Sequence, residues 1–162
     1  VEHQGVINKF TGDGLMAAFG VPIPRESWDA IATDAQRAVA CALKMGESLG
    51  ILNQRWQAQG LPEIQMRAGI FTGPVVVGSL GSKSRLEYGI IGDGVNTASR
   101  LESVDKHRQP SACRILIAHA TLDYLQDKYE VEAWGALTLK GKVEKVEVFR
   151  VIGATEFKEQ EA

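Results

Sequence analysis

One stretch of this sequence carries apolar residues at the three- and four-residue steps of a long amphipathic helix. Its apolar positions are Ala35, Val39, Ala42, Met45, Leu49, Leu52 and Trp56. Thr33 and Gln36 have the spacing of a capping box, which predicts that the helix begins at Thr33, after an irregular connection over 25–32. Gly60 followed by Pro62 predicts its end. We interpret the apolar stripe as core or as a dimer surface, and not as a cofactor site.

Short β-branched and apolar runs around this helix predict strands. These strands are expected at 6–10, 15–19, 64–72, 75–80, 86–91, 115–118, 131–139 and 146–152, with shorter helices at 95–104 and 121–125. The Asp13-Gly14 turn predicts a hairpin between the first two strands, and Gly73-Pro74 predicts another between 64–72 and 75–80. Strands joined as hairpins and mixed with helices predict an α+β sandwich, in which helices cover a mixed or mostly antiparallel sheet.

Composition limits the classes of function. A chain of 162 residues with 44% hydrophobic content is expected to form one domain that buries roughly two-thirds of its unfolded surface. The formal charge of -2 and a pI near 6.0 provide no basic field, so we expect no nucleic-acid partner.

No apolar run reaches the roughly 18 to 20 residues that span a bilayer, which predicts a soluble, cytoplasmic domain, alone or within a larger or membrane-attached protein. Cys41 and Cys113 lack disulfide-framework spacing and are expected to be reduced.

Two short motifs carry residues suited to nucleotide chemistry. The first is the run from Lys9 to Gly14, KFTGDG, and the second runs from Tyr88 to Glu102, YGIIGDGVNTASRLE. In the first motif, the Asp13 carboxylate lies on a tight turn and is open to a hard cation such as Mg²⁺. In the second, Asn96 and Arg100 are i and i+4 on one helix and can contact one ligand together.

Both motifs resemble the signatures of the class III nucleotidyl cyclase catalytic domain, the family that makes cyclic AMP or cyclic GMP. The resemblance covers about Gly5 to Ile152 and implies a ferredoxin-like cyclase sandwich over 1–153, followed by a charged tail over 154–162. The family's first strand, its first covering helices and a second metal-binding Asp precede the hairpin motif. The printed sequence begins after them, which predicts an N-terminally truncated domain whose isolated activity is low or absent.

The resemblance assigns roles to individual residues. It implies that Asp13 binds one or both of two Mg²⁺ or Mn²⁺ ions. Lys9 lies at the base-recognition position, and its ammonium can donate to adenine N1 but not to guanine N1, which carries a hydrogen. Gly89 occupies the position of the residue that accepts from the adenine amino group, where only a backbone carbonyl or a water is available.

The remaining roles concern the ribose and the phosphates. The resemblance assigns Asn96 to the ribose, Arg100 to the α-phosphate in the transition state and Lys140 to the β- and γ-phosphates. Lys83 and Arg85 are weaker candidates for phosphate contact. Each of these residues also has an ordinary structural interpretation: a turn Asp, a strand-edge Lys, an exposed Asn/Arg pair on a helix, or a Lys-Gly-Lys turn.

The predicted function is that of an adenylate cyclase, which converts ATP to cyclic AMP and pyrophosphate with two metal ions at a homodimer interface. Alternatives are a guanylate cyclase acting on GTP and a non-catalytic, nucleotide-binding regulatory module. The resemblance also implies a head-to-tail homodimer and fusion to a sensor or regulatory domain.

Overall fold

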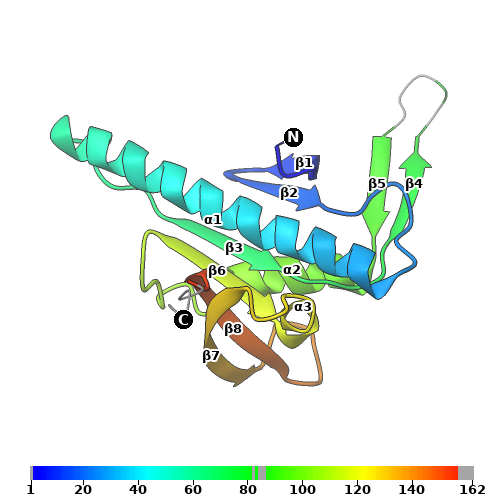
Figure 1. Ribbon diagram of the computed structural model, residues 1–162. Helices are drawn as coiled ribbons and strands as arrows, with labels where there is room; N and C mark the ends of the chain where they lie inside the picture. Colours follow the sequence, from blue (N-terminus) through cyan, green and yellow to red (C-terminus); the bar gives the residue numbers. More distant parts are fainter. Residues whose placement is uncertain (1, 82, 84–86, 157–162) are drawn as a thin grey trace, which may run out of the picture.

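A four-stranded mixed sheet organises the chain. The computed structural model describes residues 2–81, 83 and 87–156. The strands β3 (Met66–Ile70), β6 (Cys113–Ala118), β8 (Val146–Ala154) and β7 (Tyr129–Leu137) lie side by side in that order. β3 and β6 run parallel, whereas β8 is antiparallel to both β6 and β7. The mixed sheet covered by helices confirms the α+β prediction (Figure 1).

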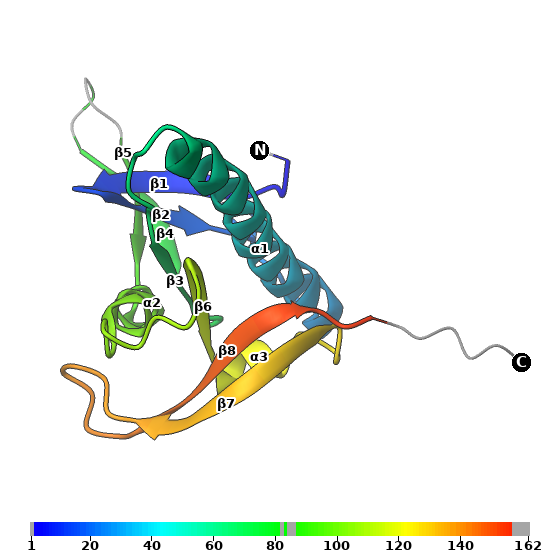
Figure 2. The same cartoon turned by 90° about the vertical axis from the view of Figure 1, so that its left-hand side faces the viewer.

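Strand β6 is buried on both faces because a helix covers each side of the sheet. Its residues Ile115 and Ile117 pack with Val39 of helix α1 (Trp28–Ala58). The alternate residues, Leu116 and Ala118, face the other side together with Leu101 of helix α2 (Asp93–Ser103), as strand periodicity requires. Figure 2 shows α1 and α2 on opposite sides of the sheet. Among the described helices, none is long and apolar enough to cross a bilayer.

Two hairpins lie outside this sheet. β1 (Val6–Thr11) pairs with β2 (Gly14–Ala18), and β4 (Val76–Leu80) pairs with β5 (Glu87–Ile91). β1 lies against β5, so the two hairpins are neighbours. A four-residue helix, α3 (His119–Leu122), follows β6. The predicted strands, the predicted first hairpin and the helix after β5 are therefore confirmed, with small shifts at their ends.

Two local predictions are wrong. Helix α1 begins five residues before Thr33, because the Ser27 hydroxyl caps it by accepting from the Ala30 amide at 3.1 Å. The Thr33 hydroxyl instead donates to the Asp29 carbonyl inside the helix. The strands around Gly73-Pro74 form no hairpin: β3 pairs with the distant strand β6, and β4 pairs with β5 across the following turn.

Helix α2 lies in direct contact with β3 at Gly69. A Cβ at this position would overlap the Ala98 carbonyl oxygen and would lie 2.5 Å from the Glu102 amide nitrogen. Both are backbone atoms, so only a shift of the whole helix could make room for a side chain.

We therefore expect Gly69→Ala to lower the free energy of unfolding by about 3 kcal/mol, measured by urea denaturation. The matched control is Gly153→Ala in β8, where a Cβ would meet nothing within 4 Å and where we expect almost no loss. Equal effects of the two substitutions would contradict the close packing of α2 on β3.

Candidate functional site

Asp13 lies at the tip of the β1–β2 hairpin. Gly12 permits the turn with a φ of +58°, and a Cβ there would meet nothing within 4 Å, so the tip is open. The Asp13 side chain is exposed and makes no hydrogen bond or ion pair with other residues of the described ranges. A free carboxylate fits one contact to a hard divalent cation, which takes its other oxygen ligands from water and phosphates. Within the described ranges, no group of three or more His, Cys, Asp or Glu side chains gathers around a common point.

Lys9 and Gly89 lie on neighbouring strands. Lys9 is an exposed residue of β1 opposite Met16 of β2, and β1 lies against β5, which carries Gly89. Gly89 in turn pairs with Gly78 of β4, so two residues without side chains face each other across that hairpin. Lys9 and Gly89 thus belong to strands that are in contact with each other.

Helix α2 carries Asn96 and Arg100. The chain enters it directly from β5 through Gly92, which occupies the N-cap position, and Asp93 is the first helical residue. No side chain of the described residues makes a capping hydrogen bond at this end of the helix. Asn96 is exposed and Arg100 is half-buried, and because they are four residues apart they lie along the same side of the helix.

The turn between β7 and β8 brings Lys140 to this helix. A Cβ at Gly141 would lie 3.0 Å from a guanidinium nitrogen of Arg100, so the turn backbone lies directly on the arginine. The next residue, Lys142, donates from its ammonium to the Asp93 carboxylate at 2.7 Å. This hydrogen bond and the positive charge of Lys142 lower the pKa of Asp93 below its usual value.

A buried arginine holds the other end of α2. The guanidinium of Arg114, on β6, is fully buried and donates four hydrogen bonds of 2.7 to 3.0 Å to backbone carbonyls. Those carbonyls belong to Glu102, Val104, Asp105 and Arg108, at and just after the C-terminus of α2. Arg67, the neighbour of Arg114 on β3, adds a hydrogen bond to the Glu102 carbonyl at 3.2 Å. Burial lowers the pKa of Arg114, but arginine starts so high that it stays charged at neutral pH.

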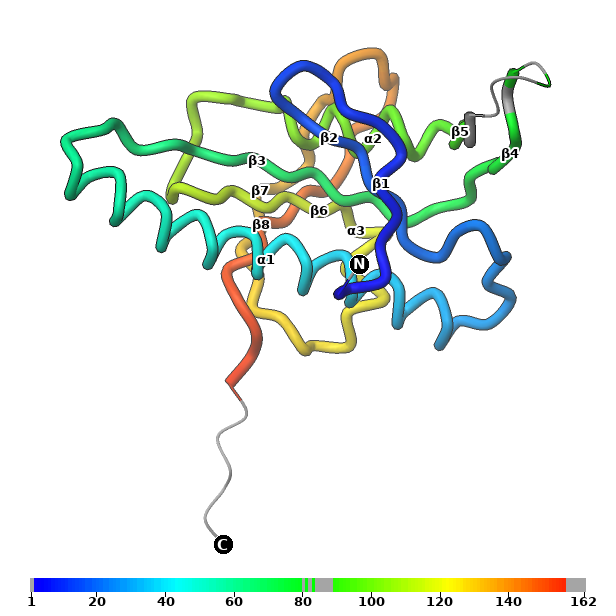
Figure 3. Tube along the Cα trace, turned by 90° about the horizontal axis from the view of Figure 1, so that it is seen from above, coloured from blue at the N-terminus to red at the C-terminus, as the bar shows by residue number. Residues whose placement is uncertain are grey.

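The predicted site residues fall into two groups. Lys9, Asp13 and Gly89 belong to the hairpin region, whereas Asn96, Arg100 and Lys140 surround α2. Within the described part of the chain, no hydrogen bond or ion pair joins Asp13 to α2. Figures 2 and 3 both show the hairpin tip, α2 and the β7–β8 turn toward the same side of the molecule.

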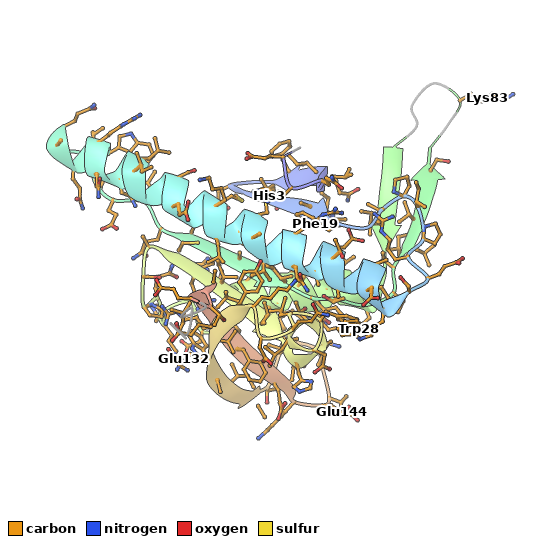
Figure 4. All side chains as sticks on the ribbon, viewed as in Figure 1. His3, Phe19, Trp28, Lys83, Glu132 and Glu144 are labelled. Atoms are coloured by element: carbon orange, nitrogen blue, oxygen red, sulfur yellow. The ribbon has the colours of Figure 1, made fainter. Side chains whose placement is uncertain are left out.

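Lys83 and Arg85 are the weaker candidates for phosphate contact. Lys83 is exposed and lies at the outer end of the loop between β4 and β5, away from α2 (Figure 4). Arg85 lies outside the described residues.

Sequence reasoning missed the contacts that three residues make in this region: Asp93, Lys142 and Arg114. The Asp93–Lys142 pair joins segments far apart in the chain, so no local spacing could indicate it. Arg114 stands one residue before the predicted strand at 115–118, and a single arginine there looks like an exposed strand end.

A comparison with known families decides the identity of the domain. The family described as "Adenylate and Guanylate cyclase catalytic domain" matches residues 3–153. This chain belongs to that family. The expected resemblance to class III nucleotidyl cyclases is thereby confirmed, and the chain is a nucleotidyl cyclase domain.

Individual relatives agree with this assignment. Adenylate cyclase 1 of Rhizobium meliloti strain 1021 is 36% identical over 151 residues, which make up 93% of this chain and 21% of that protein. The adenylate cyclase of Anabaena cylindrica is 32% identical over 93% of this chain and 28% of its own length. The chain therefore spans only about a fifth to a quarter of these relatives.

Solved structures share the fold. The adenylyl cyclase CyaB from P. aeruginosa superposes with a TM-score of 0.77 and 32% identity, over 96% of this chain and 75% of that one. The guanylyl cyclase Cya2 superposes with a TM-score of 0.75 and the same 32% identity, over 98% and 75% of the two chains. Overall similarity therefore does not separate ATP from GTP as the substrate.

The contribution of Arg114 to the attachment of α2 can be tested by measuring the free energy of unfolding. Arg114→Met keeps much of the side-chain volume but removes the donor of four hydrogen bonds to backbone carbonyls, of which those of Glu102 and Asp105 keep a second donor, so we expect a loss of about 3 to 5 kcal/mol in the free energy of unfolding. The matched control is Arg150→Met on the adjacent strand β8, where the guanidinium bonds, among the described residues, to the exposed carboxylate of Glu132 alone. There we expect a loss of about 1 kcal/mol or less by urea denaturation. Similar losses at both positions would contradict the special role of Arg114.

Proposed function

We propose that this domain is the catalytic part of an adenylate cyclase, which converts ATP to cyclic AMP and pyrophosphate. The observation that carries the proposal is the contact between Arg100 and the β7–β8 turn. It places an arginine fork beside the segment that presents Lys140, and both groups are suited to phosphate oxygens. Membership of the cyclase family and the named adenylate cyclase relatives support the same reaction.

The proposed chemistry is an intramolecular phosphoryl transfer. The ribose 3′-oxygen forms a bond to the α-phosphorus, the bond from that phosphorus to the bridging oxygen breaks, and pyrophosphate and a proton are released. Asn96 orients the ribose through its amide, and Arg100 donates to the α-phosphate oxygens as negative charge shifts there. Lys140 binds the β- and γ-phosphates and so stabilises the leaving group.

Asp13 is the proposed metal-binding residue on this chain. Its open, unpaired carboxylate fits a Mg²⁺ or Mn²⁺ ion that also binds the triphosphate. When bound, such ions lower the pKa of the attacking hydroxyl and neutralise charge on the phosphates. Two ions per site are proposed, as the family resemblance implies.

Lys9 is the reason for choosing ATP. A lysine is a donor only, which suits the acceptor N1 of adenine and conflicts with the N–H of guanine. Gly89 supplies no side-chain acceptor for the adenine amino group, so we expect the preference for ATP over GTP to be modest. A guanylate cyclase remains the alternative, because the guanylyl cyclase Cya2 is as similar to this chain as CyaB is.

Lys9→Glu should reverse the base preference. A carboxylate can accept from guanine N1 but repels the acceptor N1 of adenine, so kcat/KM for ATP should fall at least about tenfold while the GTP-to-ATP ratio rises. The measurement is cyclic nucleotide formed from ATP or GTP with Mn²⁺ by the full-length protein. Lys44→Glu is the control, because it makes the same charge change on a different element, helix α1.

The products made by the wild-type protein decide between the alternatives. Cyclic AMP as the main product supports the proposal, and cyclic GMP as the main product overturns it in favour of a guanylate cyclase. Nucleotide binding without either product would indicate a non-catalytic regulatory module.

We further propose that each active site lies between two copies of the domain. Asp13 and α2 share no bond within the described part of one chain, and the family resemblance implies a head-to-tail homodimer. Asp13 of one protomer would then bind the metal ion at the nucleotide that the partner holds through Lys9, Asn96, Arg100 and Lys140. A two-fold dimer would contain two such sites. The greater length of the relatives supports the further proposal that a sensor or regulatory domain is fused to this one.

Mixing two inactive variants tests the shared site. Asp13→Ala and Arg100→Ala full-length proteins should each lose at least about 99% of the activity, since each lacks an essential group in both sites. A mixture should recover up to roughly a quarter of wild-type activity, because the mixed dimer has one intact site. Mixing Asp13→Ala with Asn96→Ala should recover activity too, whereas Arg100→Ala with Asn96→Ala should not. No recovery in the first mixture would contradict a site shared between protomers.

A further inference from the structure

The β7–β8 turn, which carries Lys140, begins at a residue that is buried in the core. Leu139 is 1% exposed and packs beside Leu101 of α2. The Lys142 amide donates to the Leu139 carbonyl at 3.1 Å, and Gly141 has a φ of +77°, which together close a tight turn. Lys140 is exposed at the outer side of this turn.

The same turn contacts α2 at two points along one face. Lys142 forms its 2.7 Å ion pair with Asp93 in the first turn of the helix, and the Gly141 backbone lies on the Arg100 guanidinium. Asp93 and Arg100 are about two helical turns apart, and Asn96 lies between them on the same stripe. The turn therefore lies along the face that carries the residues proposed to contact ribose and α-phosphate.

The Asp93–Lys142 ion pair adds little to the stability of the fold, and its main effect is to orient the β7–β8 turn on α2. The Asp93 side chain is 72% exposed, and pairs that are so open to water contribute little to the free energy of unfolding. The Lys142 side chain is only 23% exposed, so it is packed against the protein while its ammonium contacts Asp93. The hydrogen bond from Lys142 and then the charges of Lys142 and Arg100 lower the pKa of the Asp93 carboxyl, so loss of Asp93 would remove a negative charge that both cations share.

We propose that Asp93 and Lys142 are positioning residues. Their ion pair, which we call the latch, fixes the β7–β8 turn on α2 so that Lys140 and Arg100 can bind the same triphosphate. The proposal rests on the proposed cyclase function for its substrate. The latch itself requires only the contacts between the turn and the helix. Lys142 does not contact phosphate in this account, because its ammonium is already occupied by Asp93.

A double-mutant cycle in the full-length protein tests the latch. Asp93→Asn and Lys142→Met should each raise KM for ATP and Kd for pyrophosphate roughly tenfold, with kcat reduced less than about threefold. Because both substitutions break the same contact, the double variant should be no weaker than either single variant. The thermal midpoint should stay at the wild-type value in all three. Glu144→Gln is the matched control, because Glu144 lies in the same turn, at the edge of the molecule in Figure 4, without a bond to α2 among the described residues.

Hydrogen exchange provides a readout that needs no nucleotide. In the Asp93→Asn variant, the amides of residues 140–145 should exchange at least about tenfold faster, while those of β6 are unchanged. A charge-swapped pair, Asp93→Lys with Lys142→Glu, should restore part of the protection and part of the ATP affinity.

Three outcomes would overturn the latch. They are wild-type ATP affinity in the Asp93→Asn variant, unchanged exchange in the turn, and independent losses that multiply in the double variant, which would make Lys142 a direct phosphate ligand. Absence of any cyclic nucleotide from the wild-type protein would instead overturn the proposed function, and the exchange experiment would still decide the latch.

Discussion

The guanidinium of Arg114 under the C-terminus of α2 is the interaction on which the rest of the site depends. A helix leaves its last carbonyls without partners, and one buried side chain satisfies four carbonyls at and after this end. Its positive charge also suits the negative end of the helix dipole. Because Arg114 belongs to β6, it connects the helix to a strand that is buried along nearly its whole length.

Once its C-terminus is fixed, α2 has little freedom to move. Gly69 lets the helix backbone touch β3, and Leu101 inserts into the core on the same side. The β7–β8 turn, which begins at the buried Leu139, then lies on α2 at Asp93 and Arg100. The sheet therefore positions two cationic segments, α2 and the turn, relative to each other, which is the preorganisation that charge stabilisation in a transition state needs. The β1–β2 hairpin, by contrast, presents Asp13 on an open tip.

Much of this arrangement could be predicted because its signals are local. The Asp13 turn, the helix that carries Asn96 and Arg100, and the two C-terminal strands are each specified by a few neighbouring residues. Pairing between distant segments leaves no such signal, which is why β3 was expected to pair with β4 and pairs in fact with β6. The start of α1 was misplaced because Ser27 follows two prolines and precedes the apolar stripe, so its capping role is visible only in the fold. The functions of Arg114, Asp93 and Lys142 depend on contacts across the sheet and could not be derived from spacing.

The central claim is that α2 and the β7–β8 turn of one protomer bind the triphosphate while the hairpin of its partner contributes the metal-binding carboxylate. A crystal structure of the full-length protein with Mn²⁺ and a non-cyclisable ATP analogue tests it most directly. The account predicts the α-phosphate on the Arg100 guanidinium, the terminal phosphates on Lys140, and a manganese ion on Asp13 of the partner protomer. A nucleotide bound elsewhere, or held with Arg100 turned away from its phosphates, would contradict the account.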